Sequence, residues 1–319
     1  MQNFNYHSHT YRCMHSDQDM TDEDYVKDYI KMGFKDIAIT DHCPEKNVID
    51  IRPRVRMPYS QKNEYLKSIK NLKEKYKDVI NIKSGYEVEY LPGEEESIQE
   101  LKDETDIIVL GQHFVYGDDK DLRILGKCDF NDNELLKYAD YIEKAIELGI
   151  PDIIAHPDLY MSKRNSFGEV EKEVAHRICK TAEKYNIPLE INLNNIFQRT
   201  YNEGRILNDN PLEEQRKKLV NVQYPRAEFW EIAANYNVKV LYGIDAHYRG
   251  QICRWNELVI MANEMIGEET INKLNFIDKS SNINNKIFIN DILKAGLETI
   301  QKASKNKELE DKIKKYSNY

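Results

Sequence analysis

The sequence lacks the features that mark membrane, secreted and nucleic-acid-binding proteins. Its apolar runs stop after four or five residues, far short of the roughly 20 that cross a bilayer. No basic patch followed by an apolar stretch opens the chain, as it would in a signal peptide. The five cysteines form no C-x-x-C pair, which favours reduced thiols. The net charge of −9 opposes a broad electrostatic hold on nucleic acid. These absences predict a cytoplasmic protein with neither a membrane nor a nucleic-acid partner.

The chain also lacks repeats, low-complexity segments and linkers that would separate a second domain. Its 319 residues fit one large α/β barrel. The stretch 302–319 has little apolar surface to bury. We therefore expect a single barrel over 1–301 and a polar C-terminal tail or helix over 302–319, while the oligomeric state has no signal in the sequence.

Short β-branched runs alternate with longer stretches of helical periodicity, a pattern typical of parallel β-α units. Seven strands are predicted, at Asn3–Tyr6, Asp36–Thr40, Ile80–Ser84, Ile107–Gly111, Asp152–Ala155, Pro188–Ile191 and Val238–Gly243. Helices are predicted at Thr21–Gly33, Ser60–Lys77, Glu94–Lys102, Asn133–Leu148, Gly168–Tyr185, Arg226–Asn235 and Arg249–Ile266. This alternation predicts a TIM-like parallel barrel.

Histidine is scarce, with eight residues, yet most of the histidines directly follow predicted strands. In a parallel barrel the C-terminal strand ends meet at one mouth, so side chains placed there are expected to converge. The sixth strand delivers Asn192 and Asn194 instead. The converging residues are His7 and His9, with His15 close behind, then His42, Glu87, His113, His156, Asp245 and His247.

The chemistry of this set is that of a multinuclear metal site. Neutral imidazoles and carboxylates suit Zn²⁺, Mn²⁺ or Fe²⁺, whereas a thiolate-rich set would indicate structural zinc or iron–sulfur. Seven histidines with Glu87 and Asp245 exceed what one ion can use, so two to three divalent ions are expected. A site of this kind with few or no thiolates is typical of hydrolases, because two ions can activate a shared water.

Several of these residues also have a structural interpretation. His176 lies inside a predicted helix and is expected to be structural. Asp41 is either a helix cap or a partner that orients His42, and we favour the second role. Glu89 is either a further ligand or a solvated side chain. The recurrence of ligand-type residues at strand ends carries the interpretation as a metal site.

The whole arrangement resembles the PHP (polymerase and histidinol phosphatase) superfamily, over most of the chain. The features that carry it are H-x-H with a further His six residues on, D-H, a Glu, two single His residues and a final D-x-H. The resemblance implies a distorted (β/α)7 barrel with a trinuclear metal centre. By it, His7, His9, Glu87 and Asp245 would hold the first ion, Glu87, His113 and His156 the second, and His15, His42 and His247 the third, with Asp17 as an alternative ligand.

Further stretches resemble the stand-alone histidinol-phosphatases of that superfamily. They are "MGFKDIAITDHCP", "LKSIKNLKEKYKD" leading into "IKSGYEVEYLPG", "HPDLYMSKR" and "YPRAEFWEIAANYNVKVLYGIDAH". The resemblance implies hydrolysis of L-histidinol phosphate to L-histidinol and phosphate in histidine biosynthesis. The chain departs from the pattern in the insertion "RTYNEGRILNDNPLEEQRKKLVNVQ" and in its Lys-rich C-terminal tail.

A phosphate ester also needs fixed positive charge, and the arginine fork suits its oxygens. Arg164 and Arg199 follow the fifth and sixth predicted strands, so they are expected to bind phosphate. Asp17 and His247 are candidate proton donors to the leaving group. Lys163, Arg52, Arg54 and Arg56 are held in reserve.

Three other functions stay open at this stage. A PHP module can serve a DNA polymerase as a proofreading nuclease or as a structural part, although this chain is acidic. The substrate can be another phosphate ester, such as a sugar phosphate or a phosphotyrosyl protein. The third alternative is a metal-binding scaffold without catalysis.

Overall fold

The computed structural model of the chain describes residues 2–44, 55–203, 206–208 and 210–277. Within it, Gln2–Ile277 forms one compact unit. The expected barrel end at 301, the tail over 302–319, and Arg52 and Arg54 all lie outside the described residues. No helix in the described part of the chain is both long and apolar enough to cross a membrane.

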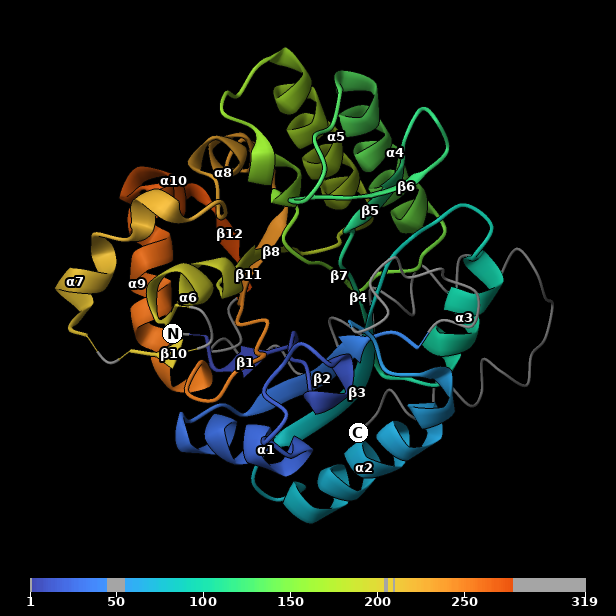
Figure 1. The fold of residues 1–319 in the computed structure, drawn as a ribbon, viewed down its shortest axis with the longest axis vertical. Coiled ribbons are helices and arrows are strands. Elements are labelled where there is room, and N and C mark those ends of the chain that lie inside the picture. The colour runs from blue at the N-terminus through green and yellow to red at the C-terminus, as the bar shows by residue number, and fades with distance from the viewer. Residues whose placement is uncertain (1, 45–54, 204–205, 209, 278–319) are drawn as a thin grey trace, which may run out of the picture. The chain divides into compact units, whose positions relative to one another are not determined.

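A curled parallel sheet of eight strands lies at the centre of this unit (Figure 1), in the order β1-β2-β3-β4-β7-β8-β11-β12. The predicted α/β barrel with seven strands is confirmed, and β12 is an additional short strand at the edge beside β11. The strands are β1 (Phe4–Asn5), β2 (Asp36–His42), β3 (Asn81–Val88), β4 (Ile107–Leu110), β7 (Ile153–Ile154), β8 (Leu189–Asn192), β11 (Lys239–Gly243) and β12 (Asn275–Phe276).

Helices surround the sheet, with α1 and α2 on one side of the ring and α4 and α5 packed together on the opposite side (Figure 1). The predicted helices are all found within a few residues, except that the last begins later than expected because Gly250 has a φ of 80°. The α-helices are α1 (Asp22–Lys31), α2 (Lys62–Tyr76), α3 (Glu95–Asp103), α4 (Asp132–Glu147), α5 (Glu169–Tyr185), α6 (Asn194–Thr200), α7 (Leu212–Arg216), α8 (Ala227–Ala233), α9 (Trp255–Ile266) and α10 (Glu268–Lys273).

Short elements between these helices and strands were not predicted. The hairpin of β5 (Phe114–Tyr116) and β6 (Leu122–Ile124) follows β4. The insertion after β8 begins in α6 and continues through β9 (Asn202–Glu203), β10 (Ile206–Leu207) and α7. These strands are two or three residues long, too short to show a period of two in the sequence.

Two apolar layers result from the alternation of side chains along the strands. Ile37 and Ile39 of β2 join the main cluster between sheet and helices, whereas Ala38 faces the other way. Ile108 and Leu110 of β4 follow the same rule. The opposite-facing residues form a small inner cluster: Phe4, Tyr6, Ala38, Ile107, Val109, Ile153, Ala155 and Leu241.

Side chains complete the seam between β1 and β11, because β1 is only two residues long. The amide of Gln2 donates to the Tyr242 carbonyl at 2.7 Å and accepts from the Tyr242 N–H at 3.0 Å. The Ile244 N–H donates to Asn5 Oδ1 at 2.8 Å. These amides stand in for backbone pairing and join the first strand to the seventh.

Backbone pairing resumes at the C-terminal end of the seam. Ser8 forms a parallel bridge with Ala246, and the His9 N–H donates to the Ala246 carbonyl at 2.8 Å. The ring of strands therefore closes at its mouth, where the residues after β1 meet those after β11.

Candidate metal centre

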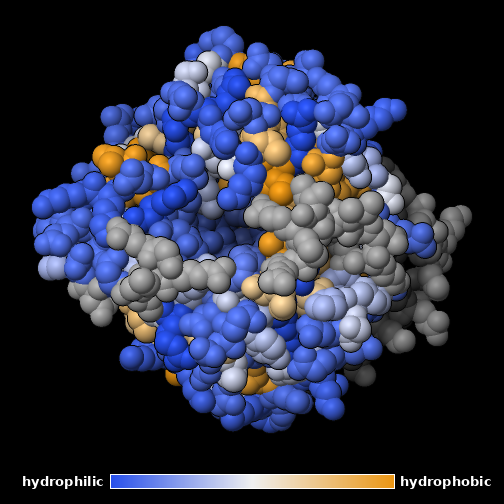
Figure 2. Space-filling model, viewed as in Figure 1, coloured by the Kyte–Doolittle hydropathy of each residue, from blue (hydrophilic) through white to orange (hydrophobic). Residues whose placement is uncertain are grey.

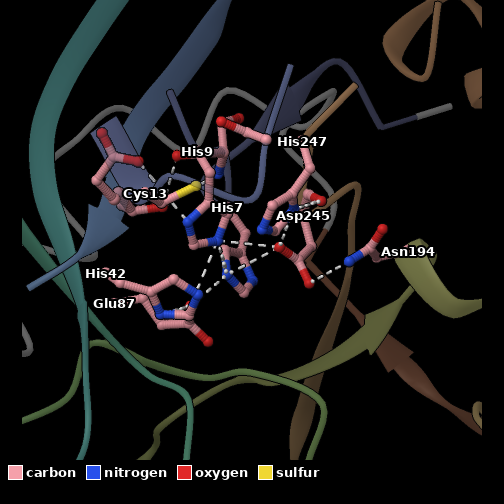
Figure 3. A network of polar contacts seen from close by, with 12 residues as sticks. His7, His9, Cys13, His42, Glu87, Asn194, Asp245 and His247 are labelled. Carbon is pink, nitrogen blue, oxygen red and sulfur yellow. Dashed lines mark hydrogen bonds and ion pairs between the residues drawn. The ribbon is translucent and has the colours of Figure 1, made fainter. Parts of the chain in front are cut away.

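The strand ends bring the predicted polar side chains together at this mouth. His42 ends β2 and Glu87 lies near the end of β3, while the other residues follow their strands directly. Figure 3 shows His7, His9, His42, Glu87, Asp245 and His247 pointing toward one another. The face of the molecule in Figure 2 is hollowed near its middle, and the hollow is hydrophilic.

The carboxylate of Glu87 lies at the centre of the cluster and is 1% exposed. Burial opposes its charge, yet His42, His7 and His113 hold the pKa of Glu87 well below its usual value. Glu87 is therefore a carboxylate anion shared by imidazoles from several strands. Its Oε2 lies 2.9 Å from His42 Nδ1, 3.3 Å from His9 Nε2 and 3.5 Å from His7 Nε2, and its Oε1 lies 3.0 Å from His156 Nε2 and 3.8 Å from His113 Nε2.

The carboxylate of Asp245 approaches the same imidazoles from the other side. Its Oδ1 lies 3.0 Å from His9 Nε2 and 3.5 Å from His7 Nε2. Its Oδ2 accepts hydrogen bonds from the side-chain amides of Asn192 and Asn194, both at 3.2 Å. The two asparagines predicted from the sixth strand thus orient Asp245 and leave its Oδ1 toward the cluster.

Hydrogen bonds on the outer nitrogen fix several of the imidazoles. His7 Nδ1 donates to Glu190 at 2.9 Å, His15 Nδ1 to the Cys13 carbonyl at 2.8 Å, and His247 Nδ1 to the Asp245 carbonyl at 2.8 Å. Such partners select the tautomer that presents Nε2 as a lone pair, as in ligating histidines. The Nε2 atoms of His15 and His247 lie 2.9 Å apart, so a shared cation or proton must offset the repulsion between two lone pairs.

The pKa directions show that the carboxylates of the cluster favour positive charge on the neighbouring imidazoles. Burial opposes charge on His7, but Asp245, Glu190 and Glu87 raise its pKa well above the usual value. Burial and His9 likewise oppose charge on His247, but Asp245 raises its pKa to about 9. Buried His9 Nδ1 and His156 Nδ1 lack hydrogen-bond partners. Imidazole and carboxylate donors of this kind fit divalent cations.

The structure brings together most of the ligand sets that were predicted. His7, His9 and Asp245 have donor atoms within 4.8 Å of one another, and so do His42, Glu87 and His113. The third predicted set differs, because His42 contacts Glu87 and the structure places His42 and His15 in separate groups with His247. His247 belongs to two further groups of donor atoms. One group contains His9 and His42 with His247, and the other contains Cys13 and His15 with His247.

Glu190 of β8 is a site residue that the sequence analysis missed. It is fully buried, contacts His7 Nδ1, and accepts a hydrogen bond from the His156 N–H at 3.2 Å. A Cβ at Gly243 would lie 1.6 Å from its Oε1, so glycine is required on β11 to make room. A signal was present, since a charged residue in the buried strand "LEIN" requires a partner.

Cys13 is the second site residue that was missed, and its single thiol agrees with the expectation of few or no thiolates. Its sulfur lies within 4.8 Å of donor atoms of His15 and His247, and also of His9 and Asp41. Burial alone would raise the pKa of this thiol, but His15, His247 and His9 hold it well below the usual value. The remaining cysteines lie elsewhere, and none of the five forms a disulfide.

The two aspartates singled out near the histidines have other partners than expected. Asp41 accepts a hydrogen bond from the Thr10 N–H at 2.7 Å, and its Oδ1 lies 3.8 Å from His9 Nδ1. It therefore stands behind His9, not His42. Asp17 Oδ1 accepts from the Asp19 N–H at 3.0 Å, and its Oδ2 lies 3.9 Å from Arg249. These contacts turn Asp17 toward the protein surface.

The cations expected to bind phosphate are distributed differently from the prediction. Arg164 is held by Glu171, by the Phe130 carbonyl at 3.1 Å and by Asp132 at 3.2 Å, beside the start of α5. Lys163 lies 3.7 Å from Asp129. These contacts place Arg164 and Lys163 near the N-terminal ends of α4 and α5, where both side chains form ion pairs within the protein.

Arg56, one of the residues held in reserve, reaches the cluster. Its Nη2 donates to Glu89 Oε1 at 2.8 Å, and the same oxygen lies 3.3 Å from His113 Nδ1. Arg199 lies in the last turn of α6, is exposed, and donates to Gln223 at 3.4 Å. His176 is on α5 and pairs with Tyr236 at 2.8 Å, outside the cluster.

The chain belongs to the PHP domain family, whose model matches residues 5–194. The match includes the candidate ligands from β1 to β7 but ends before Asp245 and His247.

Its relatives include histidinol-phosphatases. The Bacillus subtilis histidinol-phosphatase is 24% identical over 278 residues, 79% of this chain and 96% of that protein. Two solved structures share the fold. The Listeria monocytogenes protein assigned as histidinol phosphatase hisK has a TM-score of 0.62 and 23% identity, over 79% of this chain and 97% of that one. The Lactococcus lactis histidinol phosphate phosphatase, in complex with zinc, L-histidinol and phosphate, has a TM-score of 0.57 and 16% identity, over 86% and 95%.

Removing divalent cations from the purified protein is expected to lower its melting temperature by roughly 10 °C. A ligand present at about a thousand times its dissociation constant stabilises the folded protein by about 4 kcal/mol. For a protein of this size, each kcal/mol shifts the melting temperature by a few degrees. The measurement is calorimetry before and after chelation, with metal content determined on the same samples. An unchanged melting temperature after complete metal loss would show that the cluster is stable without a cation.

Proposed function

We propose that this protein is a metal-dependent phosphomonoesterase that hydrolyses L-histidinol phosphate to L-histidinol and phosphate. The observation that carries the proposal is the buried Glu87 carboxylate surrounded by imidazoles at the mouth of a PHP barrel. Similarity to the Bacillus subtilis histidinol-phosphatase over 79% of this chain and 96% of that protein supports the choice of substrate. A role in histidine biosynthesis and a cytoplasmic location belong to the same proposal.

The donor sets support two to three divalent ions, of zinc, manganese or iron. His7, His9 and Asp245 with Glu87 would hold one, Glu87 with His113 and His156 a second, and His15 with His247 a third. Bound there, the ions would polarise the phosphoryl oxygens and lower the pKa of a water nucleophile.

The surrounding residues orient this set. Glu190 fixes His7 through its outer nitrogen, and Asn192 and Asn194 fix Asp245. Arg56 supplies a buried guanidinium next to His113, so we assign it the phosphate contact first expected of Arg164. Arg199, exposed in the last turn of α6, is proposed as a second phosphate contact. Neither candidate proton donor keeps that role in this proposal, because the contacts of Asp17 lead away from the cluster and His247 uses Nε2 for the third ion and its Nδ1 proton for the Asp245 carbonyl.

Phosphate release from L-histidinol phosphate, with Zn²⁺ or Mn²⁺ supplied, tests the proposal. The panel includes p-nitrophenyl phosphate, phosphotyrosine and sugar phosphates. We expect kcat/KM for histidinol phosphate to exceed the others by at least about a hundredfold, about 2.7 kcal/mol of transition-state discrimination. Equal activity across the panel would keep a phosphatase but reject this substrate.

Substituting Arg56 by alanine is expected to raise KM for histidinol phosphate by about 10- to 100-fold, the loss of one charge-assisted contact. Metal content should stay unchanged. Arg164→Ala is the matched control. Each variant leaves a buried glutamate without its guanidinium partner, Glu89 or Glu171, so both should lower the melting temperature, but only Arg56→Ala should raise KM. A raised KM in Arg164→Ala with an unchanged KM in Arg56→Ala would make Arg164 the phosphate residue.

A further inference from the structure

The thiol of Cys13 lies where two histidines of the cluster meet. Cys13 ends a short 3₁₀ turn, Tyr11–Cys13, and Met14 after it has a φ of 63°. The His15 N–H then donates to the Cys13 carbonyl at 2.8 Å. This reversal brings the side chains of Cys13 and His15 to the same side of the chain, where their donor atoms and that of His247 all lie within 4.8 Å of one another.

The setting of Cys13 differs from that of the other buried cysteines. Cys43 and Cys179 belong to the main apolar cluster between sheet and helices. Cys13 is equally buried, at 0% exposure, but its neighbours are imidazole nitrogens and a carboxylate. Figure 3 shows its sulfur turned toward His9 and the rest of the cluster. Simple apolar packing does not account for a thiol in this position.

The thiol belongs to two groups of donor atoms, one with His15 and His247 and the other with His9 and Asp41. His15 and His247 donate their Nδ1 protons to backbone carbonyls, so both Nε2 atoms face inward, 2.9 Å apart. His9 Nδ1 is fully buried and has no hydrogen-bond partner, and it groups with the Cys13 sulfur and Asp41. A cation among these atoms would satisfy both inward-facing nitrogens and the sulfur.

We propose that Cys13 is a thiolate ligand to the metal ion held by His15 and His247. The inference rests on the proposed function and adds a sulfur donor to its third ion. As the sulfur–metal bond forms, the S–H bond breaks and its proton passes to solvent. His42, the third ligand expected there from sequence, remains with Glu87.

A thiolate at this position has a consequence for metal choice. Sulfur donors select Zn²⁺ over Mn²⁺, whereas imidazole and carboxylate sets accept either metal. Cys13→Ser should therefore shift the ratio of zinc to manganese affinity toward manganese by at least about tenfold. The other ions, with no sulfur donor, should keep their preference.

Optical spectra of the Co²⁺-loaded protein test the assignment directly. The wild-type protein should show sulfur-to-cobalt charge-transfer absorption in the near ultraviolet, and Cys13→Ser at equal cobalt content should not. Cys179→Ser is the matched control, because Cys179 is just as buried but lies in the apolar core of α5, and it should keep the band. A fully loaded wild-type protein without the band would overturn the proposal.

X-ray absorption at the zinc edge answers the same question without any substitution, should Cys13→Ser fail to fold. A sulfur neighbour at about 2.3 Å from zinc is expected, while nitrogen and oxygen neighbours alone, at about 2.0–2.2 Å, would overturn the proposal. The phosphatase assay is independent of both spectra. Activity without sulfur ligation rejects the thiolate alone, and sulfur ligation without activity rejects the phosphatase alone.

Discussion

Replacing Glu87 by glutamine is expected to lower kcat/KM for histidinol phosphate by at least about 10³-fold, about 4 kcal/mol of transition-state stabilisation. The change keeps the shape of the side chain but removes the negative charge that five imidazoles approach. Since this carboxylate belongs to two of the proposed ion sites, both should weaken together. Activity and metal content are measured on the same preparation.

The control for this variant is Glu96→Gln, which makes the same chemical change on an exposed side chain in the first turn of α3. It should leave both activity and metal content unchanged. A Glu87→Gln protein that retains full metal content and more than about a tenth of wild-type activity would contradict a bridging role for this carboxylate.

The variant Gly111→Ala should lower activity nearly as much, although it replaces none of the proposed ligands. A Cβ at Gly111 would lie 1.7 Å from Glu87 Oε1, so the carboxylate must leave its position. The backbone of Gly111 can remain paired with Val88, and we therefore expect a folded protein whose activity falls by at least about a hundredfold, as a small misplacement of catalytic groups can cause. Circular dichroism and kcat/KM are the measurements.

Alanine variants of two other glycines serve as comparisons for this result. Gly243→Ala should act through Glu190 and the orientation of His7, with a smaller loss of activity. Gly149, at the end of α4, has a φ of 69° and open space around it. Gly149→Ala should therefore cost about 1 kcal/mol of stability through backbone strain and leave kcat/KM alone. Equal activity in the Gly111 and Gly149 variants would refute the steric argument.

The parts of the fold and site that the sequence predicts are those set by local pattern. β-branched runs give the strands, and a ligand-type residue directly after a strand must lie at the mouth, whatever the details of packing. For this reason His7, His113 and Asp245 could be placed from their neighbours alone. β12 could not, because two residues carry no periodicity and its pairing with β11 depends on the whole ring.

Residues whose role depends on a distant partner were the ones misplaced or missed. Arg164 and Arg56 look alike in sequence, but one meets Glu171 and the other meets Glu89 beside His113. The charge of Glu190 in a buried strand indicates that it needs a partner, but only the structure identifies that partner as His7. The chain reverses direction at Met14, next to Cys13, and no local sequence motif predicts this reversal.

The seam between β1 and β11 gives the ring a particular order of assembly. Its two sides come from opposite ends of the described chain, with 240 positions separating the paired Gln2 and Tyr242. The proposed ligands His7 and His9 stand on one side, and Asp245 and His247 on the other. A cation held by them would act as a cross-link across a very long loop, where restricting the unfolded chain contributes most. During synthesis the ion could be captured by both sides only after His247 had emerged, so metal binding must follow the synthesis of every strand from β1 to β11.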